Sequence, residues 1–351
     1  MKKISAIVVN WNGKEVLSGC LHSLLDQDYE DYEVLVVDNG SQDGSQSLVK
    51  KEFPSIKLIE NESNLGFGPA INIGFEKAEG DYFIFLNNDL ALEPDCLRQL
   101  AKLLDSDPTV GAAIPKILYY SSSEKNTSKK GTRINSYGVL VNYTGIACPN
   151  LIDQLDNPDL SLTESACGGI FMLPREVYEK VGGFDDDLFL YHEDHDLSWR
   201  IRMMGWKLMV VPDSVCFHHY NFNKGVLKFY RSEKNRLHIL LKNFEGKTLC
   251  LIAPAIFLVE ISQIIHALFH GWLFLKLKSY LDIASQSIKI SRKRRRIQSA
   301  RKVPDKEIVR MHQAVIAVTG LKNPLVDYFL NPILKLYWIF IRRFIWSLVL
   351  E

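Results

Sequence analysis

The chain has 351 residues, a formal net charge of +1 and 24% charged residues. This length suits one large domain with an appendage, and the balanced charge argues against a nucleic-acid-binding protein. The six cysteines are scattered without a CxxC pair, so neither a disulfide framework nor a zinc knuckle is indicated.

The first hundred residues alternate between predicted strands and helices. We predict strands at 4–9, 33–37, 56–59 and 82–86, and helices at 16–25 and 67–77. We interpret the first run as a strand and not as an export signal. Apolar strands separated by helices are typical of a parallel sheet that is covered on both faces. Asn10, Asp38 and Asp89 follow three of these strands. Ligands bind beyond the carboxyl ends of such strands, so a binding site is predicted there.

The pattern loosens after residue 114 and then resumes. We expect a polar loop at 121–130, and irregular strands and turns at 133–165 that suit an acceptor-side insertion. The run 166–173 predicts a strand, and its Gly168 and Gly169 would let a ligand approach the backbone. The remaining predictions are a helix at 175–181, a turn at 182–185, a helix at 193–204, a strand at 206–211 and a mostly helical chain from 226 onward.

Three carboxylates fall within four positions in His192-Glu193-Asp194-His195-Asp196, at the start of a predicted helix. Such acids repel one another, and partial burial raises their pKa values, so the cluster is costly unless the protein uses it. An acid at a helix start is well placed to act as a general base. Together with Asp89, this segment indicates an enzyme that binds a metal-bound anionic substrate and deprotonates an acceptor.

The last third of the chain contains two apolar segments, 249–277 and 332–350. Polar residues such as Glu260 recur at helical spacing in the first, which is more typical of a helix lying in a membrane interface than of a spanning helix. The basic block Arg292-Lys293-Arg294-Arg295-Arg296 between them favours attraction to anionic lipid. The alternative is that the apolar faces pack in a homo-oligomer.

Several motifs together resemble the inverting family 2 glycosyltransferases, and among them the rhamnosyltransferase-like enzymes of polysaccharide biosynthesis. The resemblance spans roughly residues 4–240 and implies the GT-A fold, a nucleotide-sugar donor and a divalent metal, Mg²⁺ or Mn²⁺. The motifs that carry it are Asn10-Trp11-Asn12-Gly13, Val37-Asp38-Asn39-Gly40-Ser41, Asn64-Leu65-Gly66, Asn87-Asn88-Asp89, Gly182-Gly183-Phe184-Asp185 and His192-Glu193-Asp194-His195-Asp196.

The resemblance assigns the donor site residue by residue. Asp38 would hydrogen-bond the nucleotide base or ribose, although an Asx-turn that ends the strand is the alternative role. Gly66 has a plain helix-entry role as its alternative, and Arg236 would meet the pyrophosphate unless it is only a surface charge. The predicted donor-binding residues are Val9, Asn10, Asp38, Asn64, Gly66, Asn72, Asn88 and Arg236.

The segment Asn87-Asn88-Asp89 occupies the place of the family's DxD metal motif. Because Asn stands first, only Asp89 carries a full charge, and we expect it to share the metal with donor phosphates. His218 resembles a further metal or phosphate ligand. The adjacent His219 is an equal candidate for that role, and a structural histidine is the other alternative.

Asp194 matches the family's catalytic base. Inverting transfer needs a base that takes the proton of the acceptor hydroxyl as its oxygen attacks the anomeric carbon. Glu193 would orient Asp194 or the acceptor, and Asp196 is the alternative base.

The sequence thus predicts an α/β protein with a GT-A domain at 1–240, whose donor half is 1–115 and acceptor half 116–240, and a helical region at 241–351. We expect a metal-dependent transferase on the cytoplasmic face of the cell membrane, peripheral or monotopic, acting on a lipid-linked or polysaccharide acceptor. The rivals are a nucleotidyltransferase and an inactive membrane-docked scaffold. The first should carry a Gly-rich basic loop after strand one, where this chain has Asn-Trp-Asn-Gly.

Overall fold

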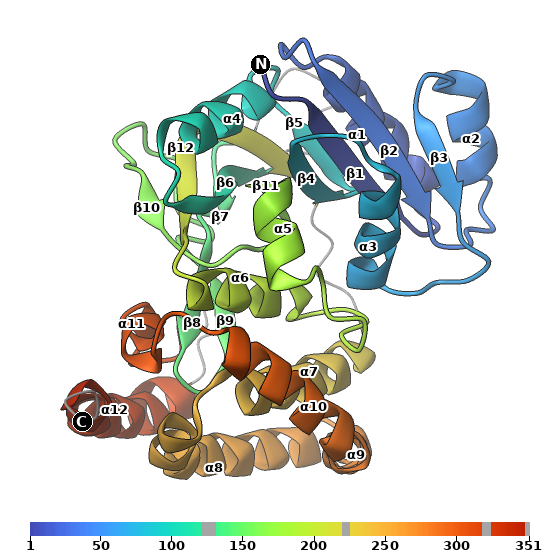
Figure 1. Cartoon of the computed structure of the whole chain (residues 1–351). Helices are drawn as coiled ribbons and strands as arrows, with labels where there is room; N and C mark the ends of the chain where they lie inside the picture. The colour runs from blue at the N-terminus through green and yellow to red at the C-terminus, as the bar shows by residue number, and fades with distance from the viewer. Residues whose placement is uncertain (121–130, 220–224, 318–323, 348–351) are drawn as a thin grey trace. The chain divides into compact units, whose positions relative to one another are not determined.

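The computed structural model describes residues 1–120, 131–219, 225–317 and 324–347, so the predicted loop at 121–130 lies outside the described residues. The chain forms two compact units, shown with their elements in Figure 1. The first comprises Met1–Val139, Pro149–Ile201 and Trp206–Phe222. The second comprises Leu140–Cys148, Arg202–Gly205 and Asn223–Glu351.

A mixed, mostly parallel sheet is the centre of the first unit, with strands in the order β10-β12-β6-β11-β4-β1-β2-β3. Strands β3, β2, β1 and β4 are parallel, whereas β11 runs antiparallel to both β4 and β6. The predicted fold class is therefore confirmed. The strands are β1 Ile4–Asn10, β2 Tyr32–Asp38, β3 Lys57–Glu60, β4 Tyr82–Asn87, β5 Leu90–Leu92, β6 Val110–Tyr119, β7 Ile134–Ser136, β10 Thr163–Glu164, β11 Ile170–Pro174 and β12 Lys207–His218.

Helices cover both faces of this sheet because apolar side chains alternate along its strands. In β1, Ala6 and Val8 pack into one apolar cluster with α1 and α4, and Ile7 packs into the other with α3, α5 and α6. The result is a three-layer α/β/α unit. Its helices are α1 Lys14–Leu25, α2 Ser45–Glu52, α3 Phe67–Lys77, α4 Cys96–Ser106, α5 Arg175–Val181 and α6 Glu193–Met203.

The strand register aligns the predicted site residues at one edge of the sheet. Asn10 lies opposite Asp38, and Val9 lies opposite Asn87, so β1, β2 and β4 end together. This edge is the usual place for a ligand in a sheet of this kind.

The second unit is mainly helical and has a small sheet of order β13-β8-β9. Helix α7 packs against α9 and α10 and belongs to this compact unit, whereas the predicted GT-A domain at 1–240 included most of it; that domain division stays a prediction. The predicted apolar segment 249–277 is two helices, α8 and the start of α9. The elements are α7 Leu227–Asn243, α8 Gly246–Phe269, α9 Leu273–Ser285, α10 Ser287–Ala300, α11 Asp305–Val309, η1 Val326–Leu330, α12 Asn331–Ser347, β8 Val139–Asn142, β9 Ala147–Pro149 and β13 His312–Gln313.

Candidate active site

A chain of side-chain hydrogen bonds joins the three strand ends. Asn88 Nδ2 donates to Asn10 Oδ1 at 2.6 Å, and Asn10 Nδ2 donates to Asp38 Oδ2 at 2.7 Å. A Cβ atom on Gly13 would lie 1.8 Å from Asn88 Nδ2, so only glycine leaves room for this amide. The asparagines at the strand ends therefore link the segment that contains Asp89 to Asp38.

Asp38 is 1% exposed and already carries several hydrogen bonds. Its Oδ1 accepts from the Ser41 amide at 2.9 Å and from Gln46 Nε2 at 2.7 Å. The Asp38 side chain thus holds the turn after β2 through the amide three residues on, which is the kind of structural role that was its alternative. Val9, half-buried beside Asn10, packs against the core of the unit. Contact of either residue with a nucleotide stays a prediction.

Asn64 and Gly66 build the entry to α3. Asn64 Oδ1 accepts from the Gly66 amide at 2.9 Å, and Asn39 Nδ2 donates to the Gly66 carbonyl at 3.0 Å. Gly66 has φ of +93°, and a Cβ there would lie 2.2 Å from the Phe189 carbonyl oxygen. The glycine is therefore required for the close approach of the segment that precedes α6.

The side chain of Asn72 makes hydrogen bonds that stabilise the turn containing Gly182 and Gly183. Its Oδ1 accepts from Tyr178 Oη at 2.5 Å and from the Phe184 amide at 3.0 Å, while Nδ2 donates to Asp186 Oδ1 at 2.8 Å. Asn72 also lines an open hollow of about 550 Å³ between α3 and α5. Its contacts are with this turn, so they do not support the predicted place in the nucleotide pocket.

The structure brings the two predicted metal ligands together. His218 Nε2 lies 3.3 Å from Asp89 Oδ2, and His218 Nδ1 lies 3.0 Å from Asn135 Oδ1. In the tautomer that carries its proton on Nδ1, the ring donates to the Asn135 oxygen and Nε2 presents its lone pair to the carboxylate; in the other tautomer, Nε2–H donates to Asp89. The first tautomer leaves Nε2 and the carboxylate as a pair of possible metal ligands. A carboxylate suits Mn²⁺ or Mg²⁺, whereas an imidazole suits a transition metal, so the pair fits Mn²⁺ better than Mg²⁺.

The neighbouring His219 has a different environment. Its ring stacks on Tyr120 at a centroid distance of 3.7 Å, and its backbone amide donates to the Asp89 carbonyl at 2.9 Å. The antiparallel pairing of β12 with β5 sets His218 opposite Leu90, next to Asp89. The geometry therefore favours His218 over His219 as the side chain that accompanies Asp89.

Asp194 lies in the first turn of α6 and is held by two backbone amides. His195 N–H donates to Oδ1 at 2.7 Å, and Gly169 N–H donates to Oδ2 at 3.1 Å. Tyr191 and His192, just before the helix, have φ of 71° and 68°, a left-handed conformation that is costly outside glycine. Strained backbone of this kind often occurs at functional sites, so the geometry supports a working role for this helix start.

Burial dominates the charge state of the acid pair. Burial raises the pKa of the Asp194 carboxyl, and the hydrogen bonds from the His195 and Gly169 amides oppose this shift. Burial, followed by the charge of Asp194, raises the pKa of Glu193 well above its usual range. Glu193 is 7% exposed, and its buried Oε2 has no hydrogen-bond partner. A protonated Glu193 beside an ionised Asp194 is the arrangement that these environments favour.

Asp196 does not share this position. It is fully buried, and its Oδ2 accepts from Arg200 Nε at 2.9 Å. A carboxylate in a buried ion pair cannot reach an acceptor hydroxyl, so the structure argues against the alternative base.

Gly168 and Gly169 connect the metal segment with the base. A Cβ on Gly168 would lie 3.8 Å from Asp194 Oδ2, and one on Gly169 would lie 3.9 Å from Asn87 Nδ2. The pair precedes β11, which runs alongside β4. The predicted metal motif and the predicted base therefore flank the same two glycines. The sequence predicts a close approach of a ligand at these glycines, whereas nothing in the sequence indicates Asn135.

Arg236 belongs to the second unit, where it is 1% exposed. Its guanidinium pairs with Glu233 and Glu260 and donates to the Thr144 carbonyl at 2.9 Å. These partners occupy the guanidinium, so the structure argues against the predicted pyrophosphate contact, and the residue has a structural role.

Comparison with known proteins agrees with this geometry. The model of glycosyl transferase family 2 matches residues 5–182, half of the chain. The chain belongs to glycosyl transferase family 2. A second model, the N-terminal domain of galactosyltransferase, matches residues 153–222, which include Asp194. Membership makes this chain a glycosyltransferase and confirms the predicted family.

Individual relatives are distant. The chain is 26% identical over 212 residues to N-acetylglucosaminyl-diphospho-decaprenol L-rhamnosyltransferase of Mycobacterium tuberculosis, covering 55% of this chain and 68% of that protein. It is 23% identical over 223 residues to poly-beta-1,6-N-acetyl-D-glucosamine synthase of Staphylococcus aureus, covering 62% of this chain and 50% of the synthase. The crystal structure of GalNAc-T7 with UDP, GalNAc and Mn²⁺ has a TM-score of 0.58 at 19% identity, covering 73% of this chain and 50% of that one.

Proposed function

We propose that this family 2 enzyme transfers a sugar, with inversion, from a nucleotide-sugar donor to a hydroxyl of a lipid-linked or polysaccharide acceptor. The observation that carries the proposal is the Asp194 carboxylate, held by two backbone amides beside the glycines that also border Asn87. This arrangement provides an oriented base next to a predicted metal site, as direct displacement requires.

In this proposal, Asp194 accepts the proton of the acceptor hydroxyl while its oxygen forms a bond to the anomeric carbon. The bond between that carbon and the diphosphate oxygen breaks, and the nucleoside diphosphate leaves with the electron pair. Glu193, kept protonated by burial, orients the acceptor as a hydrogen-bond donor. Asn10, Asp38 and Asn88 shape the nucleotide side of the site through their hydrogen-bond chain.

Asp89 and His218 would hold a divalent metal, Mn²⁺ or Mg²⁺, together with oxygens of the donor diphosphate. The ion, when bound, neutralises negative charge on the diphosphate leaving group. The facing Nε2 and carboxylate at 3.3 Å are what supports this assignment, and GalNAc-T7, which shares the fold, was crystallised with Mn²⁺.

The acceptor class and the location come from the relatives. The name of the mycobacterial relative describes a diphospho-decaprenol acceptor, and that of the staphylococcal relative describes the synthesis of a polysaccharide. Enzymes that use such acceptors work at a membrane, so we place this protein on the cytoplasmic face of the cell membrane as a peripheral or monotopic enzyme. An anionic membrane surface is its proposed partner. Rhamnose is the sugar that the mycobacterial relative suggests.

The test is a panel of nucleotide sugars in thermal-shift measurements with and without Mn²⁺, since a ligand that binds the native state raises its melting temperature. The donor that stabilises the protein is then offered with a lipid-linked acceptor, and NMR reads the anomeric configuration of the product. Inversion is the expected result, and retention would overturn the mechanism. Stabilisation by a donor without any transfer or hydrolysis would support the inactive scaffold.

The base predicts a pH profile. Because burial raises the pKa of Asp194 and a general base must be ionised, kcat/KM should rise with pH through a pKa above the usual aspartate range. Initial rates, measured from acid to neutral pH on protein shown to be folded, would give this rise of kcat/KM with pH. A rate that stays constant down to the ordinary aspartate pKa would contradict the assignment.

Asn135 predicts an effect on metal affinity. Asn135→Leu removes the oxygen that accepts from His218 Nδ1–H, so Mn²⁺ binding in the presence of a nucleoside diphosphate should weaken by about 10- to 100-fold. Asn135→Asp keeps an acceptor and should retain most of the affinity. Electron paramagnetic resonance of free Mn²⁺ measures this directly. Equal affinity in the leucine variant would show that Asn135 does not orient the ligand.

A further inference from the structure

Helix α8 is exposed in a way that a water-soluble helix rarely is. Within the described parts of the chain it is the one helix long and apolar enough to cross a membrane, with mean hydropathy 2.0 and only 22% of its most apolar window buried. Large exposed apolar surfaces mark contact with a partner or a membrane. The helix would either cross a bilayer or lie along its surface.

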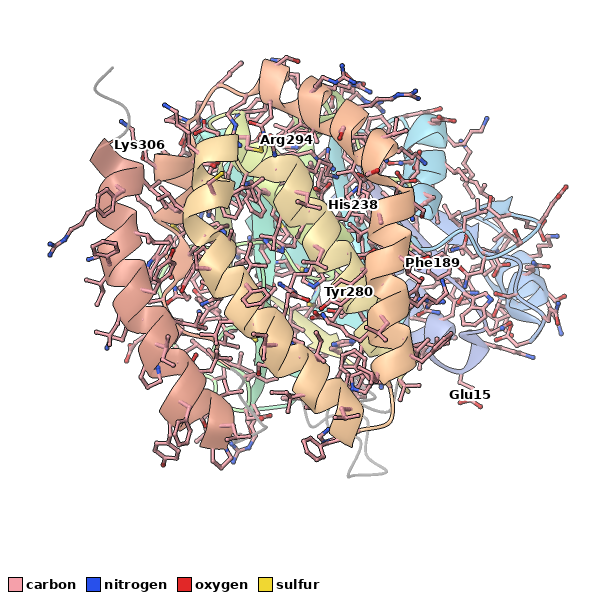
Figure 2. The ribbon with its side chains drawn as sticks, turned by 90° about the horizontal axis from the view of Figure 1, so that it is seen from below. Glu15, Phe189, His238, Tyr280, Arg294 and Lys306 are labelled. Carbon is pink, nitrogen blue, oxygen red and sulfur yellow. The ribbon has the colours of Figure 1, made fainter. Side chains whose placement is uncertain are left out.

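The polar side of α8 is anchored within its own unit. Glu260, in the second half of the helix, pairs with Arg236 of α7 and with Lys276 of α9 at 2.7 Å, and Tyr280 donates to it at 2.5 Å. Lys276 also pairs with Glu233 at 2.6 Å. Figure 2 labels Tyr280 between α8 and α9. If α8 left this cluster, buried cations would lose an acidic partner, which is strongly unfavourable.

Both halves of α8 are held. Tyr337 of α12 donates to the Leu251 carbonyl at 2.7 Å in the first half. After α8 ends, the chain turns, and Lys276 reaches back to Glu260 in the second half. A spanning helix would carry its end and α9 to the opposite membrane surface. The contacts with α9 and α12 instead keep the helix on one folded unit.

The opposite sides of α8, α9 and α12 expose large apolar residues, which we name the apolar face. On α8 the buried residues Ile252, Ala255 and Val259 form one stripe, and the exposed residues recur at helical spacing on the other side. The three helices lie side by side in Figure 2, and their contacts agree. The apolar face consists of Phe257, Ile261, Ile265 and Leu268 of α8, Phe274, Leu277 and Leu281 of α9, and Ile333, Leu336, Phe340 and Phe344 of α12.

The charge around the apolar face indicates whether a second copy of the chain or a lipid surface covers it. Helices α10 and α12 contain no acidic residue, and the single acid of α8 is Glu260, held in the ion cluster. A second copy seated on this face would bring cations against cations, whereas anionic lipid headgroups complement them. The exposed cations are Arg292, Arg295 and Arg296 of α10 and Lys335, Arg342 and Arg343 of α12.

We propose that α8 lies in the plane of an anionic phospholipid surface, with the apolar face of α8, α9 and α12 inserted in the interface, and does not cross the bilayer. The inference rests on the proposed location at a membrane. It adds which surface binds lipid and how the helix is oriented.

Depth measurement along α8 tests the orientation. Cys250 is the exposed cysteine of the described residues and lies on α8, so a fluorophore can be attached there after Cys148→Ser removes the partly exposed thiol. Phe257→Cys and Leu268→Cys, each made with Cys250→Ser, provide two more sites. The three positions are separated by about two and about three helical turns, so they share one face of the helix. Lipids brominated at different depths quench each label in full-length protein bound to vesicles.

An in-plane helix places all three labels at the same shallow depth, roughly 5–10 Å into the boundary between headgroups and acyl chains. A label at residue 257 that lies near the bilayer centre, with the other two near the surfaces, would show a spanning helix and overturn the inference. Unquenched labels in a protein that dimerises through this face would assign it to a second copy. Failure to float with anionic vesicles at all would instead refute the proposed membrane location.

A variant with fewer cations separates electrostatic attraction to anionic lipid from nonspecific apolar binding to vesicles. Arg294 donates to the Leu241 and Phe244 carbonyls at the end of α7 and is left unchanged, because its loss would disturb the fold. Changing Arg292, Arg295 and Arg296 to Gln should weaken binding to phosphatidylglycerol-containing vesicles on the order of a hundredfold, at roughly fivefold per cation. Binding to phosphatidylcholine should change little. The matched control changes the exposed Lys51, Lys77 and Lys102 of the first unit, and an equal loss there would contradict a specific surface.

Discussion

Asp194→Asn should abolish most sugar transfer while leaving donor binding intact. The amide keeps the shape of the side chain but cannot accept the proton of the acceptor, and loss of a general base costs about a hundredfold to ten-thousandfold in rate. Transfer measured with a radiolabelled nucleotide sugar gives the rate. The thermal shift produced by the same donor shows that the donor site is kept.

The variant should also stay folded, with a melting temperature close to that of the parent. A raised pKa means that the folded state binds the Asp194 proton more tightly than the unfolded state, so the stability contribution is lost as pH rises through the folded pKa. At neutral pH the ionised carboxylate therefore costs stability. The neutral amide removes that cost, but its NH2 group faces the N–H of either His195 or Gly169, so the two effects oppose each other. A melting temperature far below that of the parent would mean that the lost activity reflects a damaged fold.

Glu193→Gln is the matched control for the base. Burial and the neighbouring Asp194 charge favour a protonated Glu193, which glutamine resembles in charge and size. We expect a much smaller loss of transfer than for Asp194→Asn. If glutamine at 193 removes transfer and asparagine at 194 does not, the two residues exchange roles.

Asp89→Ala is the second large effect. It removes the charged oxygen ligand that faces His218 at 3.3 Å, so metal-dependent donor binding should be lost and transfer should fall with it. In the parent enzyme, EDTA should suppress transfer and added Mn²⁺ or Mg²⁺ should restore it. The alanine variant should respond little to added metal.

A control variant distinguishes the loss of a metal ligand from general damage to the fold. Asp95→Ala changes a half-buried carboxylate of the same unit whose side-chain contacts are with Arg98 and Gln99, and it should leave the response to metal unchanged. Full activity of the parent after exhaustive chelation would rule out the metal-assisted mechanism, whatever Asp89→Ala does.

The local pattern of apolar and polar residues predicted the strands and helices around the predicted donor site. The apolar runs of β1, β2 and β4 are buried on both faces, so their strand character and the polar residues at their ends are visible in sequence. The helix at Phe67–Lys77 is confirmed to the residue. The acids at the start of α6 stand out because three carboxylates in four positions are unfavourable without a use.

The local sequence pattern could not predict contacts between residues that are far apart in the chain. Asn135 is distant from His218 in the chain, and only the pairing of β7 with β6 and of β6 with β12 brings the two side chains to 3.0 Å. The amide of Gly169 reaches Asp194 because the segment before β11 in the sheet lies against the first turns of α6, where the Cys167 amide also donates to Ser198 Oγ at 2.9 Å. Neither contact has a signal in spacing, since both depend on sheet topology.

The charged side chains show the same division most clearly. Sequence alone determined the family, the α/β class and the acidic helix start, because local periodicity and short motifs specify them. It could not separate Asp194 from Asp196, or a ligand-binding Arg236 from a buried one, since the residue types are the same. Tertiary structure distinguishes them: Asp196 pairs with Arg200, and Arg236 pairs with Glu233 and Glu260, whereas Asp194 accepts hydrogen bonds from the His195 and Gly169 backbone amides, and its role as the base stays a prediction. Burial and partners, and not residue identity, determine what a charge can do.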